Sequence, residues 1–397
     1  MAVAAIRSLA ADGGAHAQPV TLNADRARSP ASSEAGQAWS HLAAEAVEDN
    51  VFFDPLFLTP AAAALGVDPM LITVMGEGGR LDAAMPLRRH RLGRVAPALA
   101  GFAHDYGPLG TPLLSRRDPA AAAGRLVEAA LARAGSGAAL ILPYVPDDGP
   151  AMAALADAAT RLGRQVRRES RHERAMLDRA ADGVDPRRTL PTRRRKEYDR
   201  QLRRLGDEGA TSIETAATPD DVASAFAAFV ALEAAGWKGR RRTAFANRPA
   251  ALAFARQAVV ALAAKGACSI LTLRSGERAA AMLICFTAGR TATTWKIAYD
   301  ETLGRFSPGA QLMLAAPPIL FANPAVQQID SCATPNHPMI DHLWRGRLPL
   351  ATLVIEPARH LLRYRIGHGV ARAETGARHW ARNLRRGPAA RPHHDQG

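Results

Sequence analysis

The sequence has few cysteines, few lysines and no long apolar run, and each shortage excludes a class of protein. Its three cysteines, Cys268, Cys285 and Cys332, lack the paired short spacings that metal knuckles and redox motifs need. We therefore expect a reducing compartment. No stretch approaches the roughly 20 apolar residues that cross a bilayer, and Arg7 interrupts any signal-peptide core at the start of the sequence. These features predict a cytoplasmic protein without a membrane span.

Positive charge is abundant but unevenly distributed between the two basic residue types. Only four of the 51 Lys and Arg residues are lysine, and the net charge is +14. Such a charge attracts nucleic acid, but the arginine bias is also typical of a GC-rich genome. The basic run 187–204 has an apolar edge at Tyr198, Leu202 and Leu205, which favours a surface helix.

The length of 397 residues favours two domains. We predict a flexible segment over 1–36, a first domain over 37–185, a second over 186–365 and a basic disordered tail over 366–397. Strands at 71–75 and 81–88 form a hairpin, followed by a helix at 119–134 and a strand at 138–143. In the second half we expect a helix from 219 to 235, a hairpin of 267–274 with 279–287, strands at 291–299, 326–332 and 350–355, and helices at 308–321 and 338–345. This mixture predicts an α/β fold (α+β with mixed sheets) flanked by helices.

The segment from Trp295 to Leu314 is the strongest candidate for a site. Strand alternation predicts Trp295, Ile297 and Tyr299 on one face, with Lys296 on the other. The loop from Gly304 then leads into a helix whose free amides and positive dipole end suit a pyrophosphate.

Four segments in this half resemble, in order, those of the CelD-like and FemAB-like branch of GNAT acyltransferases. They are Glu233 to Gly239, Thr243 to Phe245, Trp295 to Asp300, and Phe306 to Gly309. The first half resembles the degenerate partner domain of the same branch, so the resemblance implies tandem GNAT-like halves. It also implies an acyl-CoA cofactor, used as donor, and an amine acceptor such as an amino sugar or a polysaccharide precursor. The usual GNAT pyrophosphate loop begins with Arg or Gln and closes on Gly or Ala. Here it is one residue longer.

The resemblance and the local patterns together give three groups of candidate residues. Glu233 lies on the buried stripe of its helix and is the first candidate base, while two of the rare lysines directly follow tryptophans. The catalytic candidates are Glu233, Lys296, Tyr299, Asp330 and His337; the cofactor-binding candidates are Arg305, Ser307, Gly309 and Ala310; the substrate-binding candidates are Trp237, Lys238, Asp105 and Tyr106.

Each of these candidates also has a structural interpretation. Glu233 is suited to an ion pair with Lys238, Ser-Pro-Gly begins many helices, and the loop at Asp105 and Tyr106 is suited to a turn. His337, Asp341 and His342 lack a third carboxylate or cysteine at metal-binding spacing, so we expect no metal.

Two alternatives to acyl-CoA transfer stay open. A FemAB-like aminoacyl transfer from charged tRNA suits the positive charge, although no long helical-hairpin insertion is present. A non-catalytic GNAT-fold binding protein is the other alternative.

Overall fold

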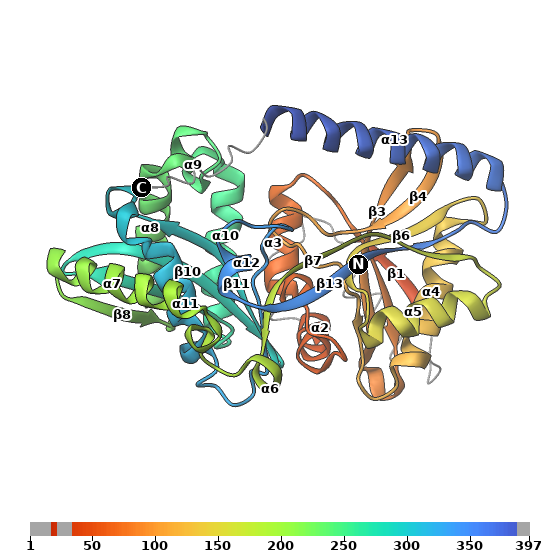
Figure 1. Ribbon diagram of the computed structural model, residues 1–397. Helices are drawn as coiled ribbons and strands as arrows, with labels where there is room; N and C mark the ends of the chain where they lie inside the picture. Colours follow the sequence, from red (N-terminus) through yellow and green to blue (C-terminus); the bar gives the residue numbers. More distant parts are fainter. Residues whose placement is uncertain (1–16, 22–33, 387–397) are drawn as a thin grey trace.

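One mixed β-sheet runs through both halves of the molecule in the computed structural model, which describes residues 17–21 and 34–386 (Figure 1). Within these residues thirteen strands are joined in the order β1-β2-β3-β4-β6-β13-β7-β12-β11-β10-β9-β8, with β5 paired to β3. The first-half strands are β1 (Ala17–Thr21), β2 (Met70–Met75), β3 (Leu81–Leu92), β4 (Ala96–Gly101), β5 (Leu113–Leu114), β6 (Ala139–Pro146) and β7 (Val166–Asp178). The later strands are β8 (Thr211–Ala216), β9 (Cys268–Ser275), β10 (Arg278–Ala288), β11 (Thr291–Tyr299), β12 (Gln328–Asp330) and β13 (Gly346–Ile355).

The sheet crosses the predicted domain boundary at residue 185. Strand β13, from the second half of the sequence, lies between β6 and β7 of the first half, and β7 in turn pairs with β12. The two halves therefore share a continuous hydrogen-bonded sheet. The predicted fold class, a mixed α/β fold with flanking helices, is confirmed.

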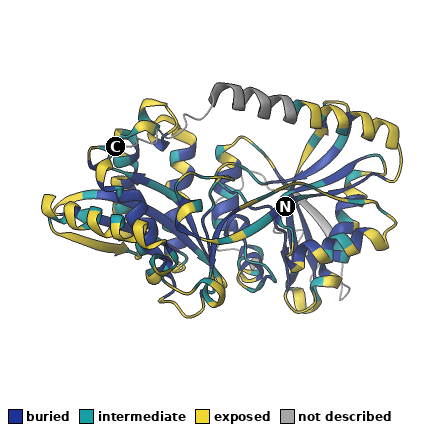
Figure 2. Cartoon of the chain, in the orientation of Figure 1, coloured by how far each residue is buried: buried dark blue, intermediate teal, exposed yellow. Residues whose placement is uncertain are grey.

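Helices cover both faces of this sheet, and Figure 2 shows its central strands as largely buried, whereas the edge strand β8 is exposed. One core lies between the halves and contains Phe57, Phe254 and Trp295, and separate cores lie under the other helices. The helices are α2 (Glu34–Glu45), α3 (Pro55–Ala64), α4 (Pro119–Ala134), α5 (Pro150–Arg161), α6 (Arg179–Asp182), α7 (Thr192–Glu208), α8 (Pro219–Ala235), α9 (Trp237–Arg240), α10 (Pro249–Ala263), α11 (Pro308–Leu320), α12 (Ile340–Leu343) and α13 (Leu361–Arg386). Short 3₁₀ segments are η3 (Val51–Phe53), η4 (Glu77–Gly79), η5 (Pro186–Thr189), η6 (Phe245–Asn247) and η7 (Glu301–Phe306).

Local capping explains where the predicted helices begin. The Asp118 carboxylate accepts the Ala121 amide at 2.9 Å before Pro119 begins α4, and the Thr218 hydroxyl accepts the Asp221 amide at 3.2 Å before α8. The helix expected at 338–345 is shorter than predicted, because only Ile340–Leu343 is helical before β13 begins.

The prediction of a disordered tail from residue 366 is wrong as far as residue 386, since α13 covers this stretch. Tyr364 is buried, and Gly367 lies so close to Leu92 and Ala96 that a Cβ there would be 2.7 Å from each. The many arginines made this segment look disordered, because the packing face formed by Tyr364 and Gly367 is small. The predicted flexible segment lies mostly in residues 1–16 and 22–33, and the end of the predicted tail in 387–397, all outside the described residues; 17–21 forms β1, which pairs with β2.

No helix in the described part of the chain is long and apolar enough to cross a membrane.

Candidate active site

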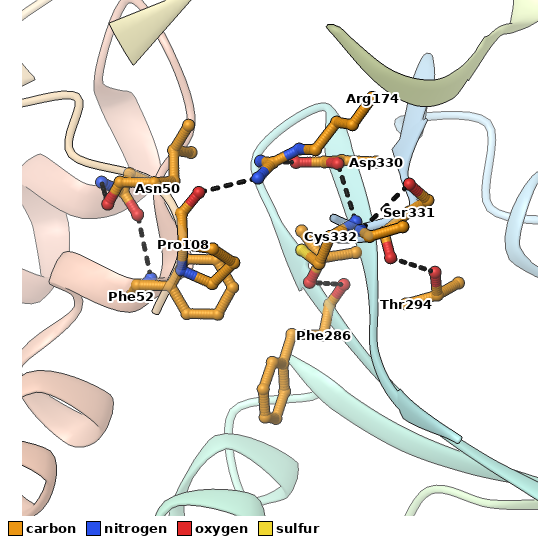
Figure 3. A network of polar contacts seen from close by, with 12 residues as sticks. Asn50, Phe52, Pro108, Arg174, Phe286, Thr294, Asp330, Ser331 and Cys332 are labelled. Atoms are coloured by element: carbon orange, nitrogen blue, oxygen red, sulfur yellow. Dashed lines mark hydrogen bonds and ion pairs between the residues drawn. The ribbon is translucent and has the colours of Figure 1, made fainter. Parts of the chain in front are cut away.

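Strands β11 and β12 separate after a short parallel pairing, and the candidate site lies at this opening. They pair only over Thr291 to Thr293 and Gln328 to Asp330. Where they diverge, the Thr294 hydroxyl donates to the Ser331 carbonyl at 3.1 Å (Figure 3). Beyond this bond the edge of β11 is free of β12, so an extended ligand has room for backbone contacts between the two strands.

A β-bulge at Trp295 overturns the predicted alternation along β11. Lys296 pairs with Ile284 and Thr294 with Cys285, which leaves Trp295 as the extra residue. Trp295 consequently packs in the core between the halves, 5.0 Å from the Phe286 ring, whereas Ile297 and Tyr299 contact the core beneath α11. The prediction that Trp295 shares a face with Ile297 and Tyr299 is therefore wrong.

A loop from the first half contacts β11 at the bulge. The Trp295 indole donates to the Tyr106 carbonyl at 2.7 Å, and the Lys296 ammonium lies 5.0 Å from the centre of the Tyr106 ring. The Tyr106 hydroxyl accepts from Arg248 at 3.3 Å. Asp105, next to it, is exposed. The predicted substrate-binding loop is thus held beside the predicted catalytic lysine.

Among the basic groups at the site, Lys296 has the most clearly shifted pKa. Burial, together with the nearby charge of Lys238, lowers its pKa from 10.5 to about 8. The negative charges of Glu233 and Asp105 act in the opposite direction but do not compensate. A lysine with such a pKa exchanges a proton readily near neutral pH.

Glu233 is buried and uses both carboxylate oxygens in hydrogen bonds. One accepts from Lys238 at 3.0 Å and the other from the Phe245 amide at 2.8 Å. Lys238 also donates to the Ile297 carbonyl at 2.9 Å, so the pair joins the end of α8 to β11 just after the bulge. Trp237, in contrast, is 40% exposed and stacks with Arg241. The ion pair offered by the sequence as the alternative role of Glu233 is present.

The predicted pyrophosphate loop forms the start of α11 on the other face of β11. Ser307 has a left-handed backbone (φ 52°), a strained conformation that turns the chain into the helix. Within the described residues, the Gly309 and Ala310 amides have no hydrogen-bond acceptor. A Cβ on Gly309 would lie 3.5 Å from the Tyr299 ring. Arg305 is paired with Glu208 at 2.6 Å on the surface.

Asp330 is placed at the opening but is already paired. It forms a buried ion pair with Arg174 of β7 and accepts the Cys332 amide at 2.9 Å. Arg174 also donates to the Pro108 carbonyl at 2.7 Å, as Figure 3 shows. Sequence reasoning missed Arg174, whose only signal was a charged residue directly before the apolar run Ala175 to Leu177.

His337 lies in a different place from the residues around Lys296. It lines a cleft of about 620 Å³ together with Arg171 and Asp341. Its Nδ1 accepts the amides of Met339 and Ile340 at 3.3 and 3.4 Å, and burial lowers its pKa. These hydrogen bonds hold the His337 ring at the start of α12.

The equivalent opening in the first half is filled by protein. Strands β4 and β6 pair in parallel over 98–100 and 139–141, and the chain that follows β4 then returns across β6. The Gly110 amide donates to the Tyr144 carbonyl at 3.0 Å, and a Cβ on Gly110 would collide with the Pro143 carbonyl. Of these two openings in the described residues, the one in the second half is therefore the one with room for an extended ligand.

Comparisons with known proteins agree with this geometry. Residues 192–316 match the family model of an acetyltransferase (GNAT) domain. The structure of FemX is similar with a TM-score of 0.54 at 11% identity, over 84% of this chain and 98% of FemX. The C-terminal domain of a candidate lysylphosphatidylglycerol synthetase from Agrobacterium fabrum has a TM-score of 0.50 at 13% identity, over 83% and 93% of the two chains. No curated protein matches the sequence.

Residues 192–316, in the second half of the chain, are therefore similar to a GNAT acetyltransferase domain. The two solved structures share its overall α/β arrangement, and at these identities the similarity concerns the fold alone.

Proposed function

We propose that the protein is an acyl-CoA-dependent N-acyltransferase of the CelD-like branch, acting on an amine of an amino sugar or polysaccharide precursor. The observation that carries the proposal is the opening between β11 and β12, which has a different chemical environment on each side. The α11 side offers the unpaired amides of Gly309 and Ala310. The side facing the first half offers Lys296 and Tyr106.

The donor phosphates fit the start of α11. Free amides at a helix N-terminus favour anions, and Ser307 and Arg305 lie directly before them. Arg305 is exposed, so its ion pair with Glu208 costs little to exchange for a phosphate. Backbone amides at the Trp295 bulge are the candidate donors to the thioester oxygen.

The acceptor amine enters from the side of Asp105, Tyr106 and Trp237. Asp105 supplies a negative charge for an ammonium, and the exposed Trp237 ring offers a surface for a sugar. When the amine attacks the thioester carbon, a C–N bond forms and the C–S bond breaks. The amine loses a proton and the departing sulfur gains one.

Lys296 is the group best suited to both proton transfers. Its ammonium donates a proton to the departing sulfur, and the resulting neutral amine accepts one from the nitrogen that has become bonded to carbon. Glu233 acts indirectly in this scheme, since Lys238 and Phe245 occupy both of its oxygens. Tyr299, on the donor side, is the second candidate proton donor; Asp330 and His337 are assigned positioning roles.

One observation favours aminoacyl-tRNA as an alternative donor. Helix α7 presents exposed Arg193, Arg194, Arg195 and Lys196 and contacts the segment η7 before the pyrophosphate loop. The fold is also that of FemX. A cationic helix beside the donor site suits the tRNA backbone.

Incubation of the full chain with a set of amino sugars and either radiolabelled acetyl-CoA or charged tRNA tests the proposal. We expect the wild type to form labelled product from acetyl-CoA, and the Lys296→Met variant to form it about 100-fold more slowly or less. Label transferred only from tRNA would replace the donor, and label transferred from neither would support the non-catalytic alternative.

A further inference from the structure

Helix α13 is fixed to the first half by one face. Tyr364 is buried, the Arg363 guanidinium donates to the Val95 carbonyl at 2.9 Å, and His368 pairs with Glu169 at 2.9 Å. Figure 1 shows the helix running across β3 and β4 at the edge of the molecule. Its orientation is therefore set by contacts along its first two turns.

The side of α13 away from Tyr364 exposes large apolar side chains to solvent. Leu362 is 74% exposed and Ile366 54%, while Val370, 40% exposed, lies at the edge of this side next to Gly93 of the β3–β4 turn. Their spacing of four residues places them on one stripe. In the sequence, apolar residues continue at helical spacing at Ala373, Ala377, Trp380 and Leu384. Isolated exposed apolar residues are ordinary, but a continuous exposed apolar stripe marks an interaction surface.

Arginines surround this stripe. Residues 361–386 contain seven arginines and a single acidic residue, Glu374. Arg365 and Arg372 are exposed on α13. At the neighbouring β3–β4 turn, Val95 is 39% exposed beside the exposed Arg94. The surface is thus apolar at its centre and cationic at its rim, and it includes two separate parts of the chain.

We propose that this face of α13, defined by Leu362, Ile366 and Val370 with the surrounding arginines, docks the protein on an anionic lipid surface. An amphipathic helix lies in the plane of such a surface with its apolar stripe in the acyl region and its arginines at the headgroups. The charge pattern favours this occupant over two alternatives. A second copy of α13 would bring arginines against arginines, and a nucleic acid would leave Leu362 and Ile366 without apolar partners.

Vesicle flotation of the full chain tests the proposal directly. The probes are vesicles of phosphatidylcholine alone and vesicles with about 30 mol% phosphatidylglycerol. We expect flotation with the anionic vesicles, little with the neutral ones, and at least about a tenfold weaker association for Leu362→Asp combined with Ile366→Asp. Raising the salt concentration should also weaken the association, because the arginine contribution is screened.

A control uses an exposed apolar residue on another element. Leu162, at the end of α5, is 42% exposed, so Leu162→Asp should float like the wild type. The double variant should keep the wild-type melting temperature, since both side chains point away from the core. No flotation of the wild type, or equal flotation of the double variant, would overturn the proposal. A vesicle-free dimer that Ile366→Asp dissociates would assign the face to self-association instead.

Discussion

Replacing Lys296 by methionine should make the protein more stable and much less active. The fall in pKa from 10.5 to about 8 means that the fold favours the neutral amine by about 3 kcal/mol. At pH 7 the ammonium therefore destabilises the folded state by up to this amount, and Met removes the charge while keeping a similar length. If the lysine is the proton relay, kcat should fall by about 100-fold or more.

The lowered pKa of Lys296 also predicts how stability changes with pH. Between about pH 8 and 10.5 the unfolded chain binds more protons at this residue than the folded one, so wild-type stability gains from rising pH in this window. The stabilising effect of Lys296→Met should be largest below pH 8 and vanish above 10.5. Because the protonated amine donates to sulfur, wild-type kcat/KM should decline above about pH 8.

Lys296→Arg separates charge from proton transfer. Arginine stays charged throughout this range, so the decline above pH 8 should disappear while the rate remains low. Urea denaturation at several pH values measures the stability, and steady-state kinetics measures the rate. A less stable but fully active Lys296→Met protein would refute the reasoning, since it would show that the lysine only packs against Tyr106.

Three further predictions follow from neighbouring contacts. Glu233→Gln should lower the free energy of unfolding by about 1–3 kcal/mol in urea titrations, because an uncharged amide with one acceptor oxygen cannot serve both Lys238 and the Phe245 amide. A large rate loss at unchanged stability would make Glu233 the base. Gly309→Val should weaken coenzyme A binding in calorimetry by at least about tenfold, while Gly309→Ala keeps the fold because its Cβ meets Tyr299 at an ordinary 3.5 Å; equal loss of folding and binding in the valine variant would speak for a purely structural glycine. Deleting residues from 361 onward should cost about 2 kcal/mol or more through the lost burial of Tyr364, seen as a lower melting temperature; an unchanged melting temperature would mean that α13 contributes nothing to the fold.

The elements predicted well from the sequence are those determined by neighbouring residues. The cap at Thr218 and the turn at Gly276 act within a few residues, so α8 and the β9–β10 hairpin are where the pattern put them. The candidate residues Tyr106, Glu233 and Lys296 also lie near one another, although their roles stay predictions.

What the sequence could not give depends on contacts between distant segments. The bulge at Trp295 arises from the pairing of β11 with β10, and it places the Trp295 ring on the face of the sheet opposite to the predicted one. Arg174 meets Asp330 only because β7 pairs with β12, 156 residues further along the chain. The insertion of β13 between β6 and β7 has no local signal at all.

Hydrogen exchange with and without saturating acetyl-CoA tests the central claim, that the acyl donor lies between β11 and β12. We expect acetyl-CoA to slow exchange at the amides of residues 294–299 and 307–311. Residues 101–110 and 142–146 in the filled opening of the first half should not change. Protection confined to the first half, or no protection at a concentration that supports acyl transfer, would contradict the account.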